Sequence, residues 1–183
     1  MRYLKIVLVI SITSILSAGI LSFANILFQK KIEENEKRAI NEAIYKIEPK
    51  TKSIKILSIK DELIYKIFDS NKKLLGYAFL AEGQGYQGKI KIMCGVDKDF
   101  EKILGIEIIE SVETPGLGGR INEAWFKDQF KNLIFSPCIT YTKTKPEKKN
   151  EIQAITGATI SSRAVVNILN LSLIHISEPT RPY

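Results

Sequence analysis

The stretch Thr156-Gly157-Ala158-Thr159-Ile160-Ser161-Ser162 stands just before an apolar-periodic segment near the C-terminus of this 183-residue chain. The periodic positions (Ala164, Val165, Ile168 and Leu169) predict that a helix begins within the stretch. The first amides of a helix have no partner within it, and the helix dipole favours negative charge there. The stretch is therefore either a phosphate-binding helix start that carries a threonine hydroxyl or an ordinary helix cap.

A second segment, Ser111-Val112-Glu113-Thr114-Pro115-Gly116-Leu117-Gly118-Gly119-Arg120, is a glycine-dense loop that follows an apolar run of β character. Pro115 fixes its own φ, whereas the glycines permit positive φ and a close approach of the backbone to a ligand. Taken alone, the pattern is typical of a turn.

Together, the motifs Glu113-Thr114-Pro115-Gly116-Leu117-Gly118 and Thr156-Gly157-Ala158-Thr159 resemble the FMN-binding domain of the G subunit of the Rnf electron-transport complex. The C subunit of the sodium-translocating NADH:quinone oxidoreductase has a related domain, but residues 156–166 are more similar to the Rnf protein. The resemblance extends from the N-terminal apolar segment to about Asn170.

The resemblance implies that Thr159 carries FMN through a phosphoester bond, made by a dedicated flavin transferase that uses FAD and a divalent metal. Thr159 would be a passive acceptor, which agrees with the lack of an evident general base near it in the sequence. The family often has an acidic residue where this chain has Gln153, which could weaken recognition by the transferase, although Glu151 is close by. The other expected flavin-binding residues are Thr156, Gly157, Ala158, Thr114, Pro115, Gly116, Leu117 and Gly118. The alternative for the loop is a hairpin turn far from Thr159.

The function implied by the resemblance is electron relay by a membrane-anchored component of an ion-translocating ferredoxin:NAD oxidoreductase complex, with the other subunits as partners. The chain would have no catalytic residues and no substrate pocket of its own. It has no G-x-G-x-x-G motif between a strand and a helix, so we do not expect it to bind NAD. The alternatives are the C subunit of the quinone reductase, a stand-alone flavinylated extracellular electron carrier, or a non-redox membrane-anchored binding domain in which Thr159 is only a cap.

Residues 6–28 are almost continuously apolar and carry no charge, which is long enough to cross a bilayer. We expect a cytoplasmic head at residues 1–5, a transmembrane helix at 6–28 and a helical juxtamembrane linker at 29–50. A cleaved signal peptide is the competing interpretation, but its apolar region is usually shorter. Flanking positive charges do not decide the orientation. The resemblance favours a flavin domain on the extracytoplasmic side of the cell membrane.

The remaining pattern predicts an α+β fold, in which the transmembrane helix is followed by a single FMN-binding domain (51–170) with helices packed on an antiparallel sheet. Residues 71–73 are typical of a hairpin turn, and 83–88 of a flexible connection. Residues 121–131 place Trp125, Phe126 and Phe130 in helical relation, typical of a core face; stacking of Trp125 near the flavin is the alternative. The expected helices cover residues 33–47 and 121–131, with a third that begins within 156–162, and the expected strands cover 54–59, 63–68, 74–81, 89–96 and 103–109.

The formal charge of +7 is spread along the chain rather than gathered in one patch. A lysine-rich loop around Pro146 lacks the interleaved aromatic residues of a nucleic-acid site, so no nucleic-acid partner is expected. A solvated loop is favoured over attraction to anionic lipid. Cys94 and Cys138 have no metal-ligand spacing, so neither a metal nor an iron–sulfur cluster is expected. A disulfide and a simple core position for Cys94 both stay open.

Residues 171–181 are identical to the translation of a common sequencing adapter, so we expect 171–183 to be an artefact and the natural chain to continue beyond Asn170. The apolar helical rhythm is expected to break there, and Pro179 cannot continue a helix. His175, the only histidine, lies in this segment and is therefore not a candidate site residue.

Overall fold

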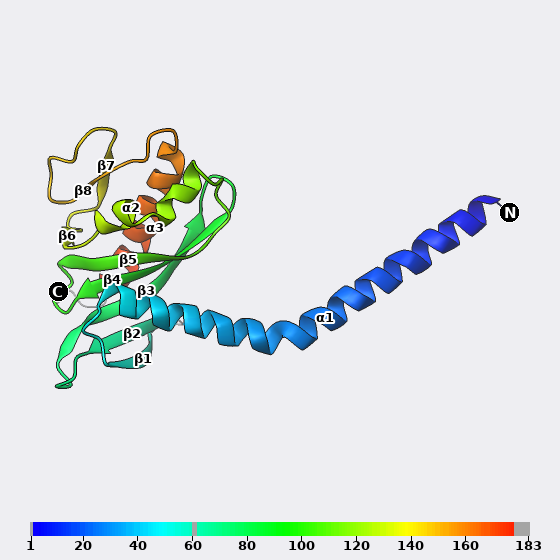
Figure 1. Ribbon diagram of the computed structural model, residues 1–183, viewed down its shortest axis with the longest axis horizontal. Coiled ribbons are helices and arrows are strands. Elements are labelled where there is room, and N and C mark those ends of the chain that lie inside the picture. Colours follow the sequence, from blue (N-terminus) through cyan, green and yellow to red (C-terminus); the bar gives the residue numbers. More distant parts are fainter. Residues whose placement is uncertain (1, 60–61, 178–183) are drawn as a thin grey trace. The chain divides into compact units, whose positions relative to one another are not determined.

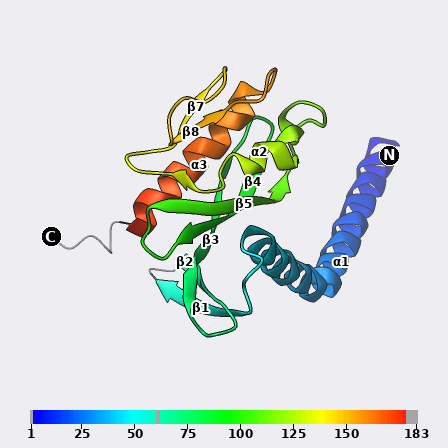
Figure 2. The same cartoon turned by 60° about the vertical axis from the view of Figure 1, so that its left-hand side comes forward.

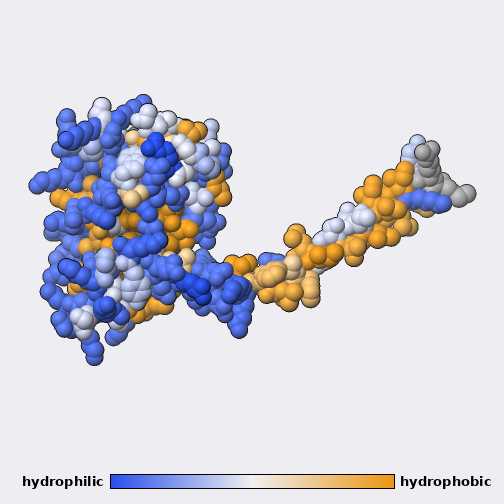
Figure 3. All heavy atoms as spheres, viewed as in Figure 1, coloured by the Kyte–Doolittle hydropathy of each residue, from blue (hydrophilic) through white to orange (hydrophobic). Residues whose placement is uncertain are grey.

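The computed structural model describes residues 2–59 and 62–177 and separates into two units, Met1–Ala39 and Ile40–Tyr183 (Figure 1). The first unit belongs to helix α1 (Arg2–Ile47), whose large apolar side chains between Ile6 and Phe28 are exposed. Figure 3 shows this apolar surface along the N-terminal part of the helix. Its most apolar window has a mean hydropathy of 2.4 and is 0% buried, so by length and composition the helix can cross a membrane.

The second unit is built on a six-stranded sheet in which neighbouring strands along the chain pair antiparallel, in the order β1-β2-β3-β4-β5-β6. Short turns make this arrangement possible. At 69–73, for example, the Asp69 carboxylate accepts hydrogen bonds from the amides of Asn71 and Lys73, both at 2.8 Å. The five long strands match the five expected runs, and β3 continues three residues beyond its expected end. The strands are β1 (Ser53–Ile59), β2 (Glu62–Phe68), β3 (Leu74–Gln84), β4 (Lys89–Asp97), β5 (Lys102–Ser111) and β6 (Leu133–Ile134).

Both faces of the sheet are covered, which explains why β4 is apolar almost throughout. Ile92, Cys94 and Val96 face the larger core, where α3 (Thr159–Ser177) packs through Val165 and Leu169. Met93 faces the opposite side and a smaller core. Figure 2 shows α3 crossing one face of the sheet. The predicted α+β fold with an N-terminal apolar helix is confirmed.

The second face is covered by the last turns of α1, through Ile40, Ala43, Ile44 and Ile47. A glycine makes this close packing possible, because a Cβ at Gly95 would lie 2.6 Å from Cγ2 of Ile47. The helix ends before Pro49, as expected. The compact unit nevertheless begins at Ile40 rather than at residue 51, so the second half of the expected linker is part of the domain.

The segment between β5 and α3 departs most from the expectation. In place of one helix over 121–131 there is a 3₁₀ turn, η1 (Gly118–Asn122), then a short helix, α2 (Ala124–Asp128). Glu123 separates them in an extended conformation, with φ −69° and ψ 143°. Phe126 and Phe130 are fully buried, which agrees with their expected core role. A small parallel pair, β7 (Thr140–Thr142) with β8 (Glu151–Gln153), was not predicted.

Helix α3 continues past Asn170 to Ser177, and both Leu173 and Ile176 are buried. The expected break of the apolar rhythm at residue 171 is therefore wrong, because these two side chains extend the buried stripe by two further turns. The origin of residues 171–183 stays a prediction, and Pro179 lies outside the described residues.

Candidate functional site

The start of α3 is prepared by a tight turn over residues 155–158. The Ala158 amide donates a hydrogen bond of 2.9 Å to the carbonyl of Ile155, and Gly157 between them has φ +81°. That conformation strains any residue with a side chain, which explains the glycine. The helix then begins at Thr159, and its first regular bond runs from the Ser162 amide to the Ala158 carbonyl (3.1 Å). The amides of residues 159–161 consequently precede the helical ladder and have no acceptor within it.

Ser162 holds this turn from inside the protein. Its fully buried Oγ accepts a hydrogen bond from the Ile155 amide at 3.0 Å and donates one to the Ala158 carbonyl at 3.1 Å. The serine pair of the motif therefore has two different roles, since Ser161 points its hydroxyl to another segment.

The glycine-rich loop lies beside this helix start. It is closed by hydrogen bonds from the amides of Leu117 (3.2 Å) and Gly119 (2.9 Å) to the carbonyl of Thr114, and Gly116 has φ +76°. A Cβ built on Gly157 would lie 3.7 Å from Cδ2 of Leu117, which is ordinary van der Waals distance. The two motifs, some forty residues apart in sequence, thus meet in space, and the alternative of a turn far from Thr159 is wrong.

A cavity of about 450 Å³ opens between the two motifs. Of the expected residues, six line it: Thr114, Leu117, Gly118, Gly157, Ala158 and Thr159. Pro115, Gly116 and Thr156 are not among its lining residues. Thr159 is half-buried at the first position of α3 and lines the cavity.

Four further lining residues were not predicted: Tyr86, Glu113, Ile160 and Ser161. Tyr86 lies in the β3–β4 turn and is 64% exposed, and Leu117 on the loop is 50% exposed. Two large apolar side chains therefore border the cavity without being packed into the core. Glu113 belongs to the loop motif given above, but in the sequence only its position before the glycines could have identified it as a site residue.

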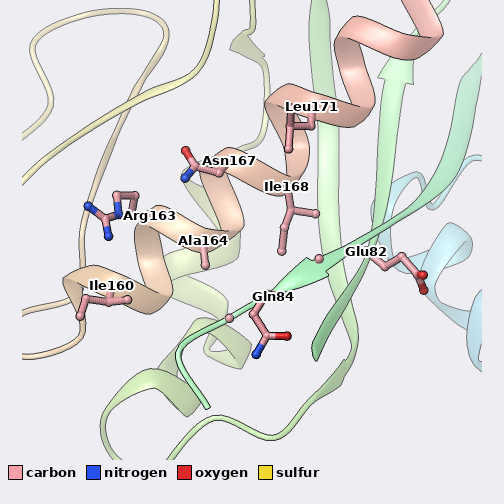
Figure 4. Close-up of a pocket in the computed structure, with 10 residues that line it drawn as sticks. Glu82, Gln84, Ile160, Arg163, Ala164, Asn167, Ile168 and Leu171 are labelled. Atoms are coloured by element: carbon pink, nitrogen blue, oxygen red, sulfur yellow. The ribbon is translucent and has the colours of Figure 1, made fainter. Parts of the chain in front are cut away.

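A second hollow of about 250 Å³ lies on the other side of Ile160, between the end of β3 and α3. Figure 4 shows Ala164 and Ile168 of α3 on the side toward Gln84, whereas Arg163 projects from the other side of the helix. Ile160 borders both hollows and is 49% exposed.

Trp125 does not line the cavity. Its indole N–H donates to the Glu123 carboxylate, and the Arg120 guanidinium lies 5.4 Å from the centre of its ring. The Trp125 hydrogen bond, followed by that of Arg120, lowers the pKa of the Glu123 carboxyl. The contacts of the tryptophan are thus with its neighbours in sequence. They give no support to the alternative that it stacks on a flavin.

Both cysteines are free thiols. Cys94 is completely buried, and this burial raises the pKa of its thiol, so it is core. Cys138 is exposed. Within residues 2–59 and 62–177, no three His, Cys, Asp or Glu side chains come close enough to form a metal site.

The cavity suits a phosphorylated aromatic ligand. The amides at the start of α3 suit a phosphate, and the exposed side chains of Tyr86 and Leu117 suit an aromatic ring system. Thr159 lines the cavity at the start of the helix.

Comparisons with known proteins agree with this geometry. Residues 85–173 match the family model described as "FMN-binding domain". The chain is 31% identical to the G subunit of the ion-translocating oxidoreductase complex of Methanosarcina acetivorans, over 94% of each chain. It is also 31% identical to the G subunit of the Na⁺-translocating ferredoxin:NAD⁺ oxidoreductase complex of Acetobacterium woodii, over 92% of this chain and 89% of that one.

Among solved structures, Shewanella oneidensis NqrC has a similar fold, with a TM-score of 0.56 and 23% identity over 69% of this chain and 65% of that chain. The matches to G subunits decide the family, because they cover nearly the whole of this chain rather than residues 85–173 alone. The chain belongs to the family of G subunits of ion-translocating oxidoreductase complexes, as its two motifs indicated.

Proposed function

We propose that this chain is the FMN-carrying electron-transfer component of an Rnf-type ion-translocating oxidoreductase complex, anchored in the membrane by α1. Its relatives are named as subunits of such complexes, and one name specifies ferredoxin and NAD⁺ as the substrates of the whole assembly. The observation that carries the proposal is the meeting of the glycine-rich loop and the Thr159 helix start around one cavity. FMN supplies the redox chemistry, and the protein supplies position and surroundings.

The proposal includes covalent attachment through Thr159. A flavin transferase would form a phosphoester bond between Thr159 Oγ1 and the FMN phosphorus of FAD. The pyrophosphate bond of FAD breaks, AMP leaves, and the hydroxyl proton passes to solvent. The half-buried hydroxyl at the start of α3 supports this role, because the same helix start that favours phosphate would hold the ester.

In this proposal the residues around the cavity have two separate roles. Amides of residues 159–161 would neutralise negative charge at the attachment point, and Leu117 and Tyr86, which line the cavity, would shield the ring from water. The covalent bond keeps the flavin at an effective concentration on the order of millimolar, even where free flavin would be lost by dilution.

Attachment is tested by expressing the full chain with a flavin transferase and measuring in-gel flavin fluorescence and intact mass. The unchanged chain and Thr159→Ser should carry one FMN, whereas Thr159→Ala should carry none. Thr144→Ala is the matched control, because Thr144 is an exposed threonine outside both motifs. Equal covalent fluorescence in Thr159→Ala and the unchanged chain would reject Thr159 as the attachment site.

The proposal also places the domain on the extracytoplasmic side, where it would contact the other subunits and lipid. The exposed Cys138 and the buried Cys94 provide a test. A membrane-impermeant maleimide added to intact cells should label the chain once, and Cys138→Ser should abolish the labelling. Labelling that appears only after the cells are broken would place the domain in the cytoplasm.

A further inference from the structure

Glu113 is a buried carboxylate, 6% exposed, that joins three separate segments at the cavity. Its Oε1 accepts hydrogen bonds from the amides of Tyr86 (2.7 Å) and Gln87 (2.9 Å) in the β3–β4 turn. Its Oε2 accepts one of 2.5 Å from the hydroxyl of Ser161 in the first turn of α3. Both carboxyl oxygens of Glu113 therefore have partners outside its own segment, Oε1 in the β3–β4 turn and Oε2 in the first turn of α3.

Two glycines leave the room that this carboxylate occupies. A Cβ on Gly85 would lie 2.5 Å from Oε1 of Glu113. A Cβ on Gly118 would lie 2.4 Å from Oε2 and 2.5 Å from the Ser161 hydroxyl. Gly118 was expected to allow close approach to a ligand, but in the structure it first allows close approach to Glu113.

The segments joined in this way are those that carry the cavity wall: the turn with Tyr86, the loop with Leu117, and the start of α3 with Thr159. Their contacts with Glu113 are 26 to 48 residues apart in sequence, so local structure alone does not fix them. A buried donor that loses its acceptor also costs more than the hydrogen bond itself contributes.

We propose that Glu113 is the positioning residue of the flavin site, whose carboxylate holds the β3–β4 turn and the start of α3 against the glycine-rich loop. Among the described residues it has no hydrogen bond with Thr159. It acts through the amides of the β3–β4 turn and through Ser161, and so keeps the walls of the cavity in one arrangement. This inference rests on the proposed function, because the effect it predicts is on an attached flavin.

The test compares Glu113→Ala and Glu113→Gln in the full flavinylated chain, with visible circular dichroism of the attached flavin as the readout. Glutamine can accept from both amides through its oxygen and donate to Ser161 through its nitrogen, so it should keep most of the wild-type signal. Among chains that carry covalent FMN, alanine should abolish the induced signal per attached flavin, because the ring is tethered and no longer held.

Glu107→Gln is the matched control. Glu107 lies on β5, the strand that ends two residues before Glu113, and pairs with Lys127 (2.8 Å) and Lys46 (3.5 Å), but it does not line the cavity. Its loss should affect stability without changing the flavin signal. An induced signal in Glu113→Ala equal to that of the unchanged chain would overturn the inference.

A second measurement needs no flavin. In the Thr159→Ala background, Glu113→Ala should speed hydrogen exchange at the Tyr86 and Gln87 amides by about 10- to 100-fold, because each amide loses its acceptor. Glu107→Gln should not. If exchange at these amides is unchanged in Glu113→Ala, the positioning role is refuted, whether or not the chain binds flavin. If instead the unchanged chain carries no FMN after expression with the transferase, the proposed function alone is refuted.

Discussion

Helices α1 and α3 are both long and apolar enough to cross a membrane, yet α1 is exposed and α3 is packed into the domain. The window of highest hydropathy in α1 has a mean of 2.4 and is 0% buried, whereas that of α3 has a mean of 1.2 and is 44% buried. Helix α3 has one apolar face, which covers the sheet through Val165, Leu169 and Leu173. Helix α1 is apolar all round over residues 6–28, and within the first unit nothing covers it.

The difference teaches that an apolar composition indicates that a helix must be shielded from water. It does not indicate whether protein or lipid shields it. The sheet shields α3 in this way, and we propose that the hydrocarbon of a bilayer shields α1. Matched substitutions in the two helices should therefore affect different properties of the same protein.

The largest effect is expected from Leu169→Asp in α3. Leu169 is 0% exposed, and an unpaired carboxylate there should cost about 4 kcal/mol or more, comparable with the whole stability of a domain. The detergent-solubilised chain should lose its cooperative thermal transition and its protease resistance. A melting temperature equal to that of the unchanged protein would mean that α3 is not the core helix.

A smaller effect, on a different property, is expected from Leu16→Asp in α1. A charge near the middle of a membrane helix opposes insertion by about 2.5–3.5 kcal/mol. The variant should shift from the carbonate-resistant membrane fraction to the soluble fraction, while the melting temperature of its domain stays unchanged. Leu169→Asp is its control, since that chain should remain in the membrane. If Leu16→Asp destabilised the domain instead, the contrast between the helices would be lost.

The smallest effect comes from two hydroxyls that donate to helix carbonyls. Ser162→Ala should cost about 1–3 kcal/mol, because it leaves the buried Ile155 amide without its acceptor. Thr13 donates to the Ile10 carbonyl (2.9 Å) at an exposed position, so Thr13→Ala should stay within about 0.5 kcal/mol. Urea titration of both variants measures the contrast, and equal costs would argue against the turn at 155–158 being held by Ser162.

The long strands could be predicted because each carries its own signal, an alternating or continuous apolar run of six or more residues. The pair β7–β8 could not, since three-residue strands in a lysine-rich segment have too few positions to show a period. The helix expected at 121–131 was misjudged because three aromatic residues at helical spacing also suit two short turns with an extended Glu123 between them.

The residues of the site likewise fall into those that were predicted from the sequence and those that were missed. Thr159, its motif and the loop were identified from resemblance, and the whole-length relatives confirm the family. Tyr86, Glu113 and Ser161 were missed as site residues, because their roles depend on contacts between segments that no local pattern records. Attachment of FMN to Thr159 stays a prediction until it is measured.

The packing of Ile44 and Ile47 against the sheet has a practical consequence for anyone who wishes to study the redox domain in solution. A version cut at residue 50, where the sequence suggests a linker, would leave Ala78 and Met93 facing water and invite aggregation. A version that starts a few residues before Ile40 keeps the final turns of α1, which cover that face of the sheet. It lacks only the part of α1 that lipid would cover.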